Sequence, residues 1–269
     1  MSTARPFVKC AGGKARLVPE LLARAPKTFG AYHEPFVGGG ALFFALRPRR
    51  AFLSDANPDL IAAYEAVRDR PKALAERLET LAETHAADPK STYYQIRSER
   101  PRSGLHRAAR LIYLNKTCFN GLWRVNSKGE FNVPIGDYKR PTLFDAFNLG
   151  ACSTALNVAT LNAEDFRRVA DRAIAGDLVY FDPPYVPLSE TSSFASYAAG
   201  GFGPQDQADL RDLALVLKRR GVHVLLSNSG CEEVERLYSK DFQIHKVKAR
   251  RSINSKKAGR GAVVEYVIS

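Results

Sequence analysis

Short apolar runs alternate with amphipathic stretches along most of the chain. Runs bounded by Gly, Pro, Asp or Asn are typical of buried strands, and such runs lie at 31–33, 51–55, 155–160, 178–181, 222–227, 242–247 and 262–268. Apolar residues at helical spacing predict helices at 17–24, 41–46, 57–68, 71–86, 91–100, 105–116 and 205–220. Strands that alternate with helices predict an α/β fold.

The middle of the chain departs from this alternation. Its helices follow one another with no strand between them, and turn residues at 126–129 then separate two β-like runs within 117–134, which predicts a hairpin. We therefore expect two units. Residues 1–56 and 155–269 form an α/β unit, and residues 57–154 form an inserted, mostly helical unit that carries the hairpin.

The turn D-P-P-Y at 182–185 follows the buried run 178–181, where open α/β sheets bind their ligands. Two consecutive prolines make this turn stiff. An aromatic amine is a poor nucleophile, and two acceptors aimed at its hydrogens favour the tetrahedral amine that forms during attack. Asp182 and the carbonyl of Pro183 provide two such acceptors, and Tyr185 provides a flat surface for a base. A base treated in this way has to leave the duplex first.

A strand, a glycine-rich turn and a helix follow one another at 31–46, which is the opening of a nucleotide-binding fold. Asp55 ends the next strand and can accept hydrogen bonds from ribose hydroxyls, although an Asp at this place also serves as a helix N-cap. Lys14 follows a glycine pair and can meet a carboxylate or phosphate. Alone, that pattern is more typical of a loop.

The net charge of +12 is concentrated in two segments. Residues 97–140 hold ten Lys or Arg against three Asp or Glu, and residues 246–260 hold seven Lys or Arg and no acid. Such clustering favours a polyanion as partner over general solubility, although solvated basic loops would look the same. The hairpin interleaves aromatic, amide and basic side chains. In it Arg124 can pair with guanine O6 and N7. The later segment 189–203 can reach phosphate through Ser189 and Thr191.

These motifs, in this order, resemble the DNA adenine methyltransferase (Dam) family, N6-adenine-specific and of the D-P-P-Y type. The resemblance covers nearly the whole chain and implies a Rossmann-like S-adenosylmethionine-dependent domain with an inserted recognition domain. It implies methyl transfer to N6 of a flipped-out adenine in double-stranded DNA, within G-A-T-C. The catalytic residues that it implies are Asp182, Pro183, Pro184 and Tyr185.

The resemblance also implies the residues that hold S-adenosylmethionine. The chain departs from the family at Cys10, where many members carry an aromatic residue, and this bears on any stacking with the cofactor. Asp165 is as well explained as a helix-start acid. The expected cofactor set is Cys10, Lys14, Pro35, Phe36, Gly38, Gly40, Asp55, Asp165, Phe166 and Asp182.

For DNA, the resemblance implies base reading by Leu122 and Arg124, and places Asn120 near the gap that the flipped base leaves. It assigns phosphate contacts to Asn126 and Asn132. The complete expected DNA-binding set is Lys9, Asn120, Leu122, Arg124, Asn126, Asn132, Pro134 and Ser189.

Other classes are less well supported. The four cysteines have no C-x-x-C spacing, so we expect reduced thiols and no metal. No apolar run approaches the roughly 18 residues that span a membrane, and residues 1–9 lack the apolar core of a signal peptide. We therefore expect a cytoplasmic protein. The resemblance leaves room for a restriction endonuclease as partner, which the residues do not specify.

Three alternative functions stay open at this stage. The same chemistry could act on RNA, although Arg124 in a hairpin favours duplex DNA. The acceptor could be another amine such as a glutamine side chain, but the related turn then usually begins with Asn, and here Asp182 begins it. The third alternative is a catalytically dead DNA-binding relative. The intact Asp182, Asp55 and glycine loop oppose it, and Cys10 keeps it open.

Overall fold

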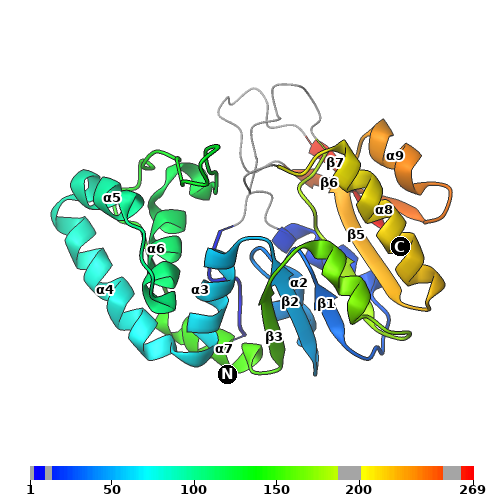
Figure 1. The fold of residues 1–269 in the computed structure, drawn as a ribbon, viewed down its shortest axis with the longest axis horizontal. Coiled ribbons are helices and arrows are strands. Elements are labelled where there is room, and N and C mark those ends of the chain that lie inside the picture. Colours follow the sequence, from blue (N-terminus) through cyan, green and yellow to red (C-terminus); the bar gives the residue numbers. More distant parts are fainter. Residues whose placement is uncertain (1–2, 10–13, 187–200, 251–261) are drawn as a thin grey trace.

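The structure of the protein is a computed structural model that describes residues 3–9, 14–186, 201–250 and 262–269. In this part of the chain seven strands form one sheet in the order β3-β2-β1-β4-β5-β7-β6 (Figure 1). The predicted α/β class is confirmed. The strands are β1 Tyr32–Glu34, β2 Ala51–Asp55, β3 Ala159–Ala163, β4 Leu178–Phe181, β5 His223–Ser229, β6 Ile244–Arg250 and β7 Ala262–Ile268.

The sheet is parallel from β3 to β5, and β7 runs antiparallel to both β5 and β6. Strand order reverses between β1 and β4, which are neighbours in the sheet but lie far apart in sequence. In a parallel sheet this reversal leaves a crevice at the carboxyl ends of the two strands. The turns that follow β1 and β4 therefore meet at one point of the sheet edge.

Both faces of the sheet are covered, and the residues of β4 show how. All four of its side chains are buried. Leu178 and Tyr180 belong to one hydrophobic cluster, whereas Val179 and Phe181 belong to another. This alternation is the period-2 geometry of a strand with core on each side.

Helices from the first part of the chain cover one face of the sheet, and helices from the last part cover the other. On one side lie α1 Val18–Arg24, α2 Ala41–Leu46 and α3 Pro58–Asp69; on the other lie α8 Pro204–Arg219 and α9 Glu232–Tyr238. A separate group of helices stands beside the sheet, with α3 and α7 between (Figure 1). It comprises α4 Pro71–Ala87, α5 Pro89–Ser98 and α6 Gly104–Thr117, and the chain returns to the sheet through α7 Ala146–Leu156.

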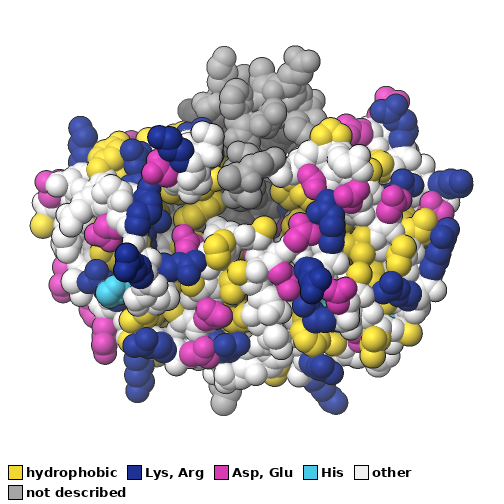
Figure 2. All heavy atoms as spheres, viewed as in Figure 1, with side chains coloured by type: hydrophobic (Ala, Val, Ile, Leu, Met, Phe, Trp, Pro, Cys, Tyr) yellow, Lys and Arg dark blue, Asp and Glu magenta, His cyan; other side chains and the backbone are white. Residues whose placement is uncertain are grey.

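Charged side chains cover the face shown in Figure 2, where Lys and Arg are spread over the whole view and interleaved with Asp and Glu. In the described part of the chain, no helix combines the length and the apolar character needed to cross a membrane.

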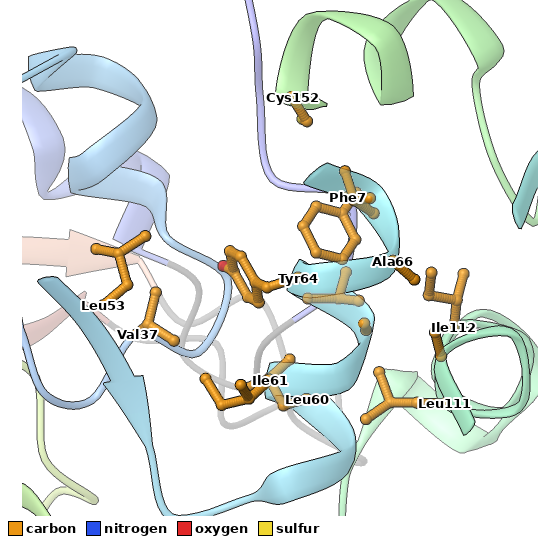
Figure 3. Packing of buried hydrophobic residues seen from close by; sticks show 14 of the residues in the cluster. Phe7, Val37, Leu53, Leu60, Ile61, Tyr64, Ala66, Leu111, Ile112 and Cys152 are labelled. Atoms are coloured by element: carbon orange, nitrogen blue, oxygen red, sulfur yellow. The ribbon is translucent and has the colours of Figure 1, made fainter. Parts of the chain in front are cut away.

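Helix α3 joins the sheet to the helical group. Figure 3 shows its side chains Ile61 and Tyr64 facing Val37 and Leu53 of the sheet region, while Leu111 and Ile112 of α6 approach it from the opposite side. All of these residues belong to one continuous buried cluster. The helical group is therefore held against the sheet by a shared apolar core.

One predicted strand was wrong at its start. The run 155–160 does not begin a strand at 155, because α7 continues to Leu156 and β3 begins only at Ala159. Asp145 caps α7 by accepting a hydrogen bond of 3.0 Å from the backbone N–H of Asn148. Helix α9 was not predicted at all.

The predicted hairpin is present in outline, with a short ladder. It consists of the isolated antiparallel bridges Cys118↔Ile135 and Val125↔Phe131 around a turn at 126–130. A 3-10 turn, η2 Phe119–Gly121, interrupts the first arm. Side chains rather than a long ladder must therefore hold this segment.

A buried polar cluster fixes the opposite, amino-terminal edge of β1 and β4. The carboxylate of Asp177 accepts hydrogen bonds from the backbone N–H of Ala31 at 2.7 Å and of Ile174 at 3.1 Å, and it lies 2.9 Å from His33 Nε2. Burial lowers the pKa of His33, so its ring is neutral and Nε2–H donates. Burial alone would raise the pKa of Asp177, but these donors bring it below its usual value.

We expect Asp177→Ala to lower the free energy of unfolding by about 3 kcal/mol or more, because it leaves buried donors without an acceptor. Urea unfolding measures this as a lower midpoint at an unchanged slope. The matched control is Asp171→Ala, an exposed carboxylate that pairs only with Arg168 in the described structure, at 3.1 Å. We expect the control to change stability by about 0.5 kcal/mol or less, and equal effects of the two variants would contradict the assignment.

Candidate active site

Asp182 stands immediately after β4, at the crevice between β4 and β1. Its Oδ1 accepts a hydrogen bond of 2.7 Å from the hydroxyl of Ser227 on β5 and lies 3.0 Å from Lys14 Nζ. The Ser227 oxygen lies 2.9 Å from the hydroxyl of Tyr180. Because Ser227 uses its only hydrogen on Asp182, Tyr180 is the donor to Ser227. Two strands thus fix the orientation of the carboxylate.

Side chains from β5 and α8 clamp the rest of the D-P-P-Y turn. Gln207 Nε2 donates to the carbonyl of Pro184 at 2.9 Å, and Asn228 Nδ2 donates to Gln207 Oε1 at 3.1 Å. Asn228 Oδ1 accepts from the backbone N–H of Val186 at 3.2 Å. The turn is therefore rigid through its partners as well as through its prolines.

Tyr185 is contacted at its hydroxyl and at one face of its ring. Its hydroxyl donates to Glu265 Oε2 on β7 at 3.0 Å. The ammonium of Lys14 lies 4.2 Å from the ring centroid, within cation–π distance. Lys14 therefore contacts both Asp182 and Tyr185 in this structure.

The glycine loop after β1 is held by Asp55 at the end of β2. Asp55 Oδ2 accepts from the backbone N–H of Gly38 at 3.1 Å, and Oδ1 accepts from that of Asn57 at 3.0 Å. Gly40 has φ +66°, and a Cβ there would lie 2.7 Å from the hydroxyl of Tyr64. The positive φ and this close approach favour glycine at the position.

Glu34 ends β1 beside this loop and is buried with 2% of its surface exposed. The hydroxyl of Tyr32 donates to its Oε2 at 2.9 Å. Burial raises the pKa of Glu34 well above its usual value, and the nearby Asp182 and Asp55 raise it further. Burial therefore favours the neutral carboxylic acid form of Glu34.

An aromatic cluster borders the other side of the loop. The rings of Phe36 and Phe166 are stacked with centroids 5.2 Å apart, and Phe202 lies 5.7 Å from each of them. Asp165 accepts from the backbone N–H of Arg167 at 2.9 Å and caps the 3-10 helix η3 Phe166–Asp171. The helix-start role of Asp165 is confirmed.

Arg167 was not predicted, although it organises this corner. Its guanidinium pairs with Asp165 at 3.0 Å, with Asp206 at 2.8 Å and with Asp209 at 2.6 Å. It also covers the ring of Phe166, at 4.4 Å from the centroid. Arg167 therefore ties the segment after β3 to the first turns of α8.

A mainly apolar pocket lies between the glycine loop and the hairpin. Gly38 and Asp55 line it from the sheet region and Leu60 from α3. Lys9 lines it from the N-terminal segment and Trp123 from the hairpin. The pocket brings together the predicted cofactor loop and the predicted recognition segment.

The structure places the expected DNA-binding residues in and beside the hairpin. Asn120 has a positive φ of 54°, which is unusual for a residue other than glycine. Leu122 packs against the core cluster, and the carbonyl of Pro134 accepts from the backbone N–H of Phe119 at 2.9 Å. Arg124 and Asn132 face each other, as described below.

Lys9 is held against this segment from outside it. Its backbone N–H donates to Asn115 Oδ1 at 2.7 Å, and Asn115 Nδ2 donates back to its carbonyl at 2.7 Å. Its ammonium lies 4.4 Å from the ring centroid of Tyr138. Pro35 lies in the glycine loop, next to Phe36. Cys10, Ser189 and Thr191 lie outside the described residues.

Sequence reasoning missed the residues that support the turn, namely Ser227, Asn228, Gln207 and Glu265. One signal was available for the first two, because Ser227 ends the apolar run 222–227 and Asn228 follows it, at the carboxyl edge of a strand. The other two come from α8 and β7, and only the tertiary structure brings them to the site. In the described part of the chain, no three His, Cys, Asp or Glu side chains are grouped as a metal site.

The chain matches the family described as D12 class N6 adenine-specific DNA methyltransferase over residues 11–253. It is 42% identical over 274 residues to a type II methyltransferase of Lactococcus lactis subsp. cremoris, covering 98% of this chain and 95% of the relative. Identity to a type II methyltransferase of Methanocaldococcus jannaschii is 40%, over 94% of this chain and 93% of the relative. Identity to the DNA adenine methylase of Escherichia coli K12 is 37%, over 99% and 95%.

The raised pKa of Glu34 gives stability a particular pH dependence. Because its pKa is higher in the folded than in the unfolded protein, the unfolded chain ionises first as pH rises. The contribution of Glu34 is thus fully present below its unfolded pKa near 4.5 and is lost as pH rises toward the folded value. Each unit of pKa difference corresponds to about 1.4 kcal/mol.

Glu34→Gln removes the ionisable group and keeps an oxygen that can accept from Tyr32. We therefore expect the variant to gain stability relative to the parent protein as pH is raised from 5 to 8. Urea midpoints of both proteins across this range measure the difference. A difference that does not change with pH would show that Glu34 is ionised in the folded protein.

Proposed function

The chain belongs to the D12 class of N6 adenine-specific DNA methyltransferases, and from this we propose that it transfers the methyl group of S-adenosylmethionine to adenine N6 in duplex DNA, within G-A-T-C. The observation that supports the chemistry best is the Asp182 carboxylate, which Ser227 orients beside Tyr185 at the β1–β4 crevice. The carboxylate, the flat ring and the crevice are what an extruded base requires.

The residues around the crevice fit S-adenosylmethionine. We assign the ribose hydroxyls to the Asp55 carboxylate, and we assign a close backbone approach to Gly38, which donates to Asp55, and to Gly40. Phe36, Phe166 and Asp165 form the side that we assign to the cofactor adenine. We assign the remaining contacts to Cys10, Lys14, Pro35 and Asp182. When bound, the cofactor supplies a methyl group on a sulfonium centre.

Two acceptors prepare the amine for attack. The Ser227 and Lys14 contacts of Asp182 are made to Oδ1, which leaves Oδ2 to accept from one amine hydrogen. Gln207 occupies the carbonyl of Pro184, so the carbonyl of Pro183 is the second acceptor. Both acceptors are fixed before the reaction, so they stabilise the developing tetrahedral amine with little reorganisation.

Lys14 has to move before a base can stack on Tyr185. Its ammonium now covers that ring and touches Asp182. The carboxylate of a bound amino-acid cofactor is a competing partner for this ammonium. Cofactor binding by Lys14 would then uncover the ring and one carboxylate oxygen for the base.

We propose that residues 57–154 are the target-recognition unit and that 1–56 and 155–269 are the catalytic unit. The chain leaves the sheet after β2 and returns at β3, and α4 to α6 stand beside the sheet in Figure 1. The hairpin lies across the apolar pocket from the glycine loop. Residues of the hairpin and of the glycine loop therefore line one pocket. The proposed DNA contacts are Lys9, Asn120, Leu122, Arg124, Asn126, Pro134 and Ser189.

The test of this function is methyl transfer from labelled S-adenosylmethionine to plasmid DNA with and without G-A-T-C sites, followed by mapping of modified bases. We expect N6-methyladenine confined to that sequence. Label at adenines outside G-A-T-C would support the proposed reaction and contradict the proposed target sequence. Label only in RNA, or tight DNA binding without label, would overturn the proposal.

We expect Asp182→Ala to reduce turnover at least about 100-fold, because one of two preorganised acceptors is lost. DNA binding should change little, since the carboxylate acts on the amine and not on the backbone of the duplex. Single-turnover methylation and a DNA titration measure the two effects. Asp212→Ala, an exposed carboxylate paired with its neighbour Arg211, is the control; activity retained in Asp182→Ala would contradict the mechanism.

We expect Arg124→Ala to lose about 1–3 kcal/mol of discrimination at one base pair of the target, the usual contribution of a bidentate Arg–guanine contact. Competition between matched duplexes that differ at single base pairs locates that pair. A variant with unchanged sequence preference would remove Arg124 from the base-reading set.

A further inference from the structure

Arg124 and Asn132 face each other across the recognition hairpin. Arg124 Nε donates a hydrogen bond of 2.8 Å to Asn132 Oδ1. The backbone N–H of Asn132 also donates to the carbonyl of Arg124 at 3.1 Å, next to the Val125↔Phe131 bridge. Both side chains are half-buried. The contact is therefore built into the hairpin by its backbone pairing.

The atom used in this contact matters for base reading. A guanidinium has five N–H donors in one plane, and a base-edge contact to guanine uses two of them in parallel. Donation through Nε uses the nitrogen next to the aliphatic chain and leaves the two terminal nitrogens, Nη1 and Nη2, for the base. It also fixes the plane of a side chain that would otherwise lose rotamer freedom on binding.

We propose that Asn132 is a positioning residue for sequence specificity, whose amide oxygen orients Arg124 for base reading. This deepens the proposed function and rests on it. It differs from the phosphate contact that family resemblance implies for Asn132. The two roles predict different behaviour, because base contacts specify the target and phosphate contacts do not.

The hairpin turn has its own support and does not need Asn132. The backbone of Asn126 pairs with Glu130, and Asn126 Oδ1 accepts from the backbone N–H of Glu130 at 2.9 Å. Glu130 is held by Asn126 Nδ2 at 3.1 Å and by Arg100 Nη2 at 3.0 Å. Trp123 and Phe131 add an aromatic contact with centroids 4.8 Å apart. Loss of the Asn132 side chain therefore leaves the turn closed.

The first experiment measures binding and methylation of the target duplex against duplexes changed at the base pair that Arg124→Ala identifies. We expect Asn132→Ala to lower discrimination at that pair by about 5-fold or more, in the same direction as Arg124→Ala. The double variant should discriminate no worse than Arg124→Ala alone, because both substitutions act on the same base contact, the one made by Arg124. Additive losses would contradict the proposal.

Asn132→Asp separates the two roles. It keeps an acceptor oxygen for Arg124 Nε, so discrimination should remain near that of the parent protein. Its negative charge should weaken binding of all duplexes to a similar degree. It also provides the test if Asn132→Ala proves unfolded by circular dichroism. Lost discrimination in Asn132→Asp, with the fold intact, would overturn the proposal.

A phosphate role would give a different result for Asn132→Ala. Affinity would fall uniformly across sequences, with discrimination unchanged, and that outcome overturns the positioning role. The matched control is Lys128→Ala, at the exposed turn of the same hairpin, which we expect to leave discrimination unchanged.

Failure of the proposed function remains distinguishable. The parent protein would then show no methyl transfer to adenine in DNA, whichever variant is compared. Failure of the Asn132 proposal alone leaves the parent protein active and selective, with Asn132→Ala equally selective.

Discussion

The fold has to accommodate carboxyl groups at one edge of the sheet. Glu34, Asp55 and Asp182 end or follow β1, β2 and β4, which are neighbours in the parallel sheet. Adjacent strands lie about 4.8 Å apart, so three ionised groups there would repel strongly in a partly desolvated crevice. The structure resolves this differently at each position. Burial raises the pKa of Glu34, backbone N–H groups donate to Asp55, and Ser227 and Lys14 contact Asp182.

Helix α3 connects this edge of the sheet to the helical group. Tyr64 on α3 donates to the carbonyl of Gly38 at 3.0 Å, while other faces of the same helix pack on α6. The helix that fixes the proposed cofactor loop therefore also fixes the base of the hairpin. A close-packed interior has few voids that could absorb a displacement. The hairpin is therefore positioned relative to the edge of β1 and β4 by a packed core and not by a linker.

The sequence predicted most of the fold because the strands are short, largely apolar runs punctuated by turn residues. It failed at 155–160, where the apolar end of α7 merges with the start of β3 and periodicity alone cannot separate them. At the site, the ligand turns were predictable because they follow strand ends. Gln207, Glu265 and Arg167 were not, since each reaches the site from an element whose position depends on tertiary packing.

The hairpin shows why its residues are hard to assign from sequence alone. With isolated bridges in place of a long ladder, amide and charged side chains must hold its shape, and these are the residue types that also contact DNA. An Asn in such a segment has two possible partners, the protein and the phosphate, and composition does not distinguish them. The structure shows a protein partner for both amides, because Asn126 bonds to the turn and Asn132 bonds to Arg124. On the proposed positioning role, a substitution at Asn132 alters target choice without removing a base contact, while the turn after β4 is held by separate contacts to β5.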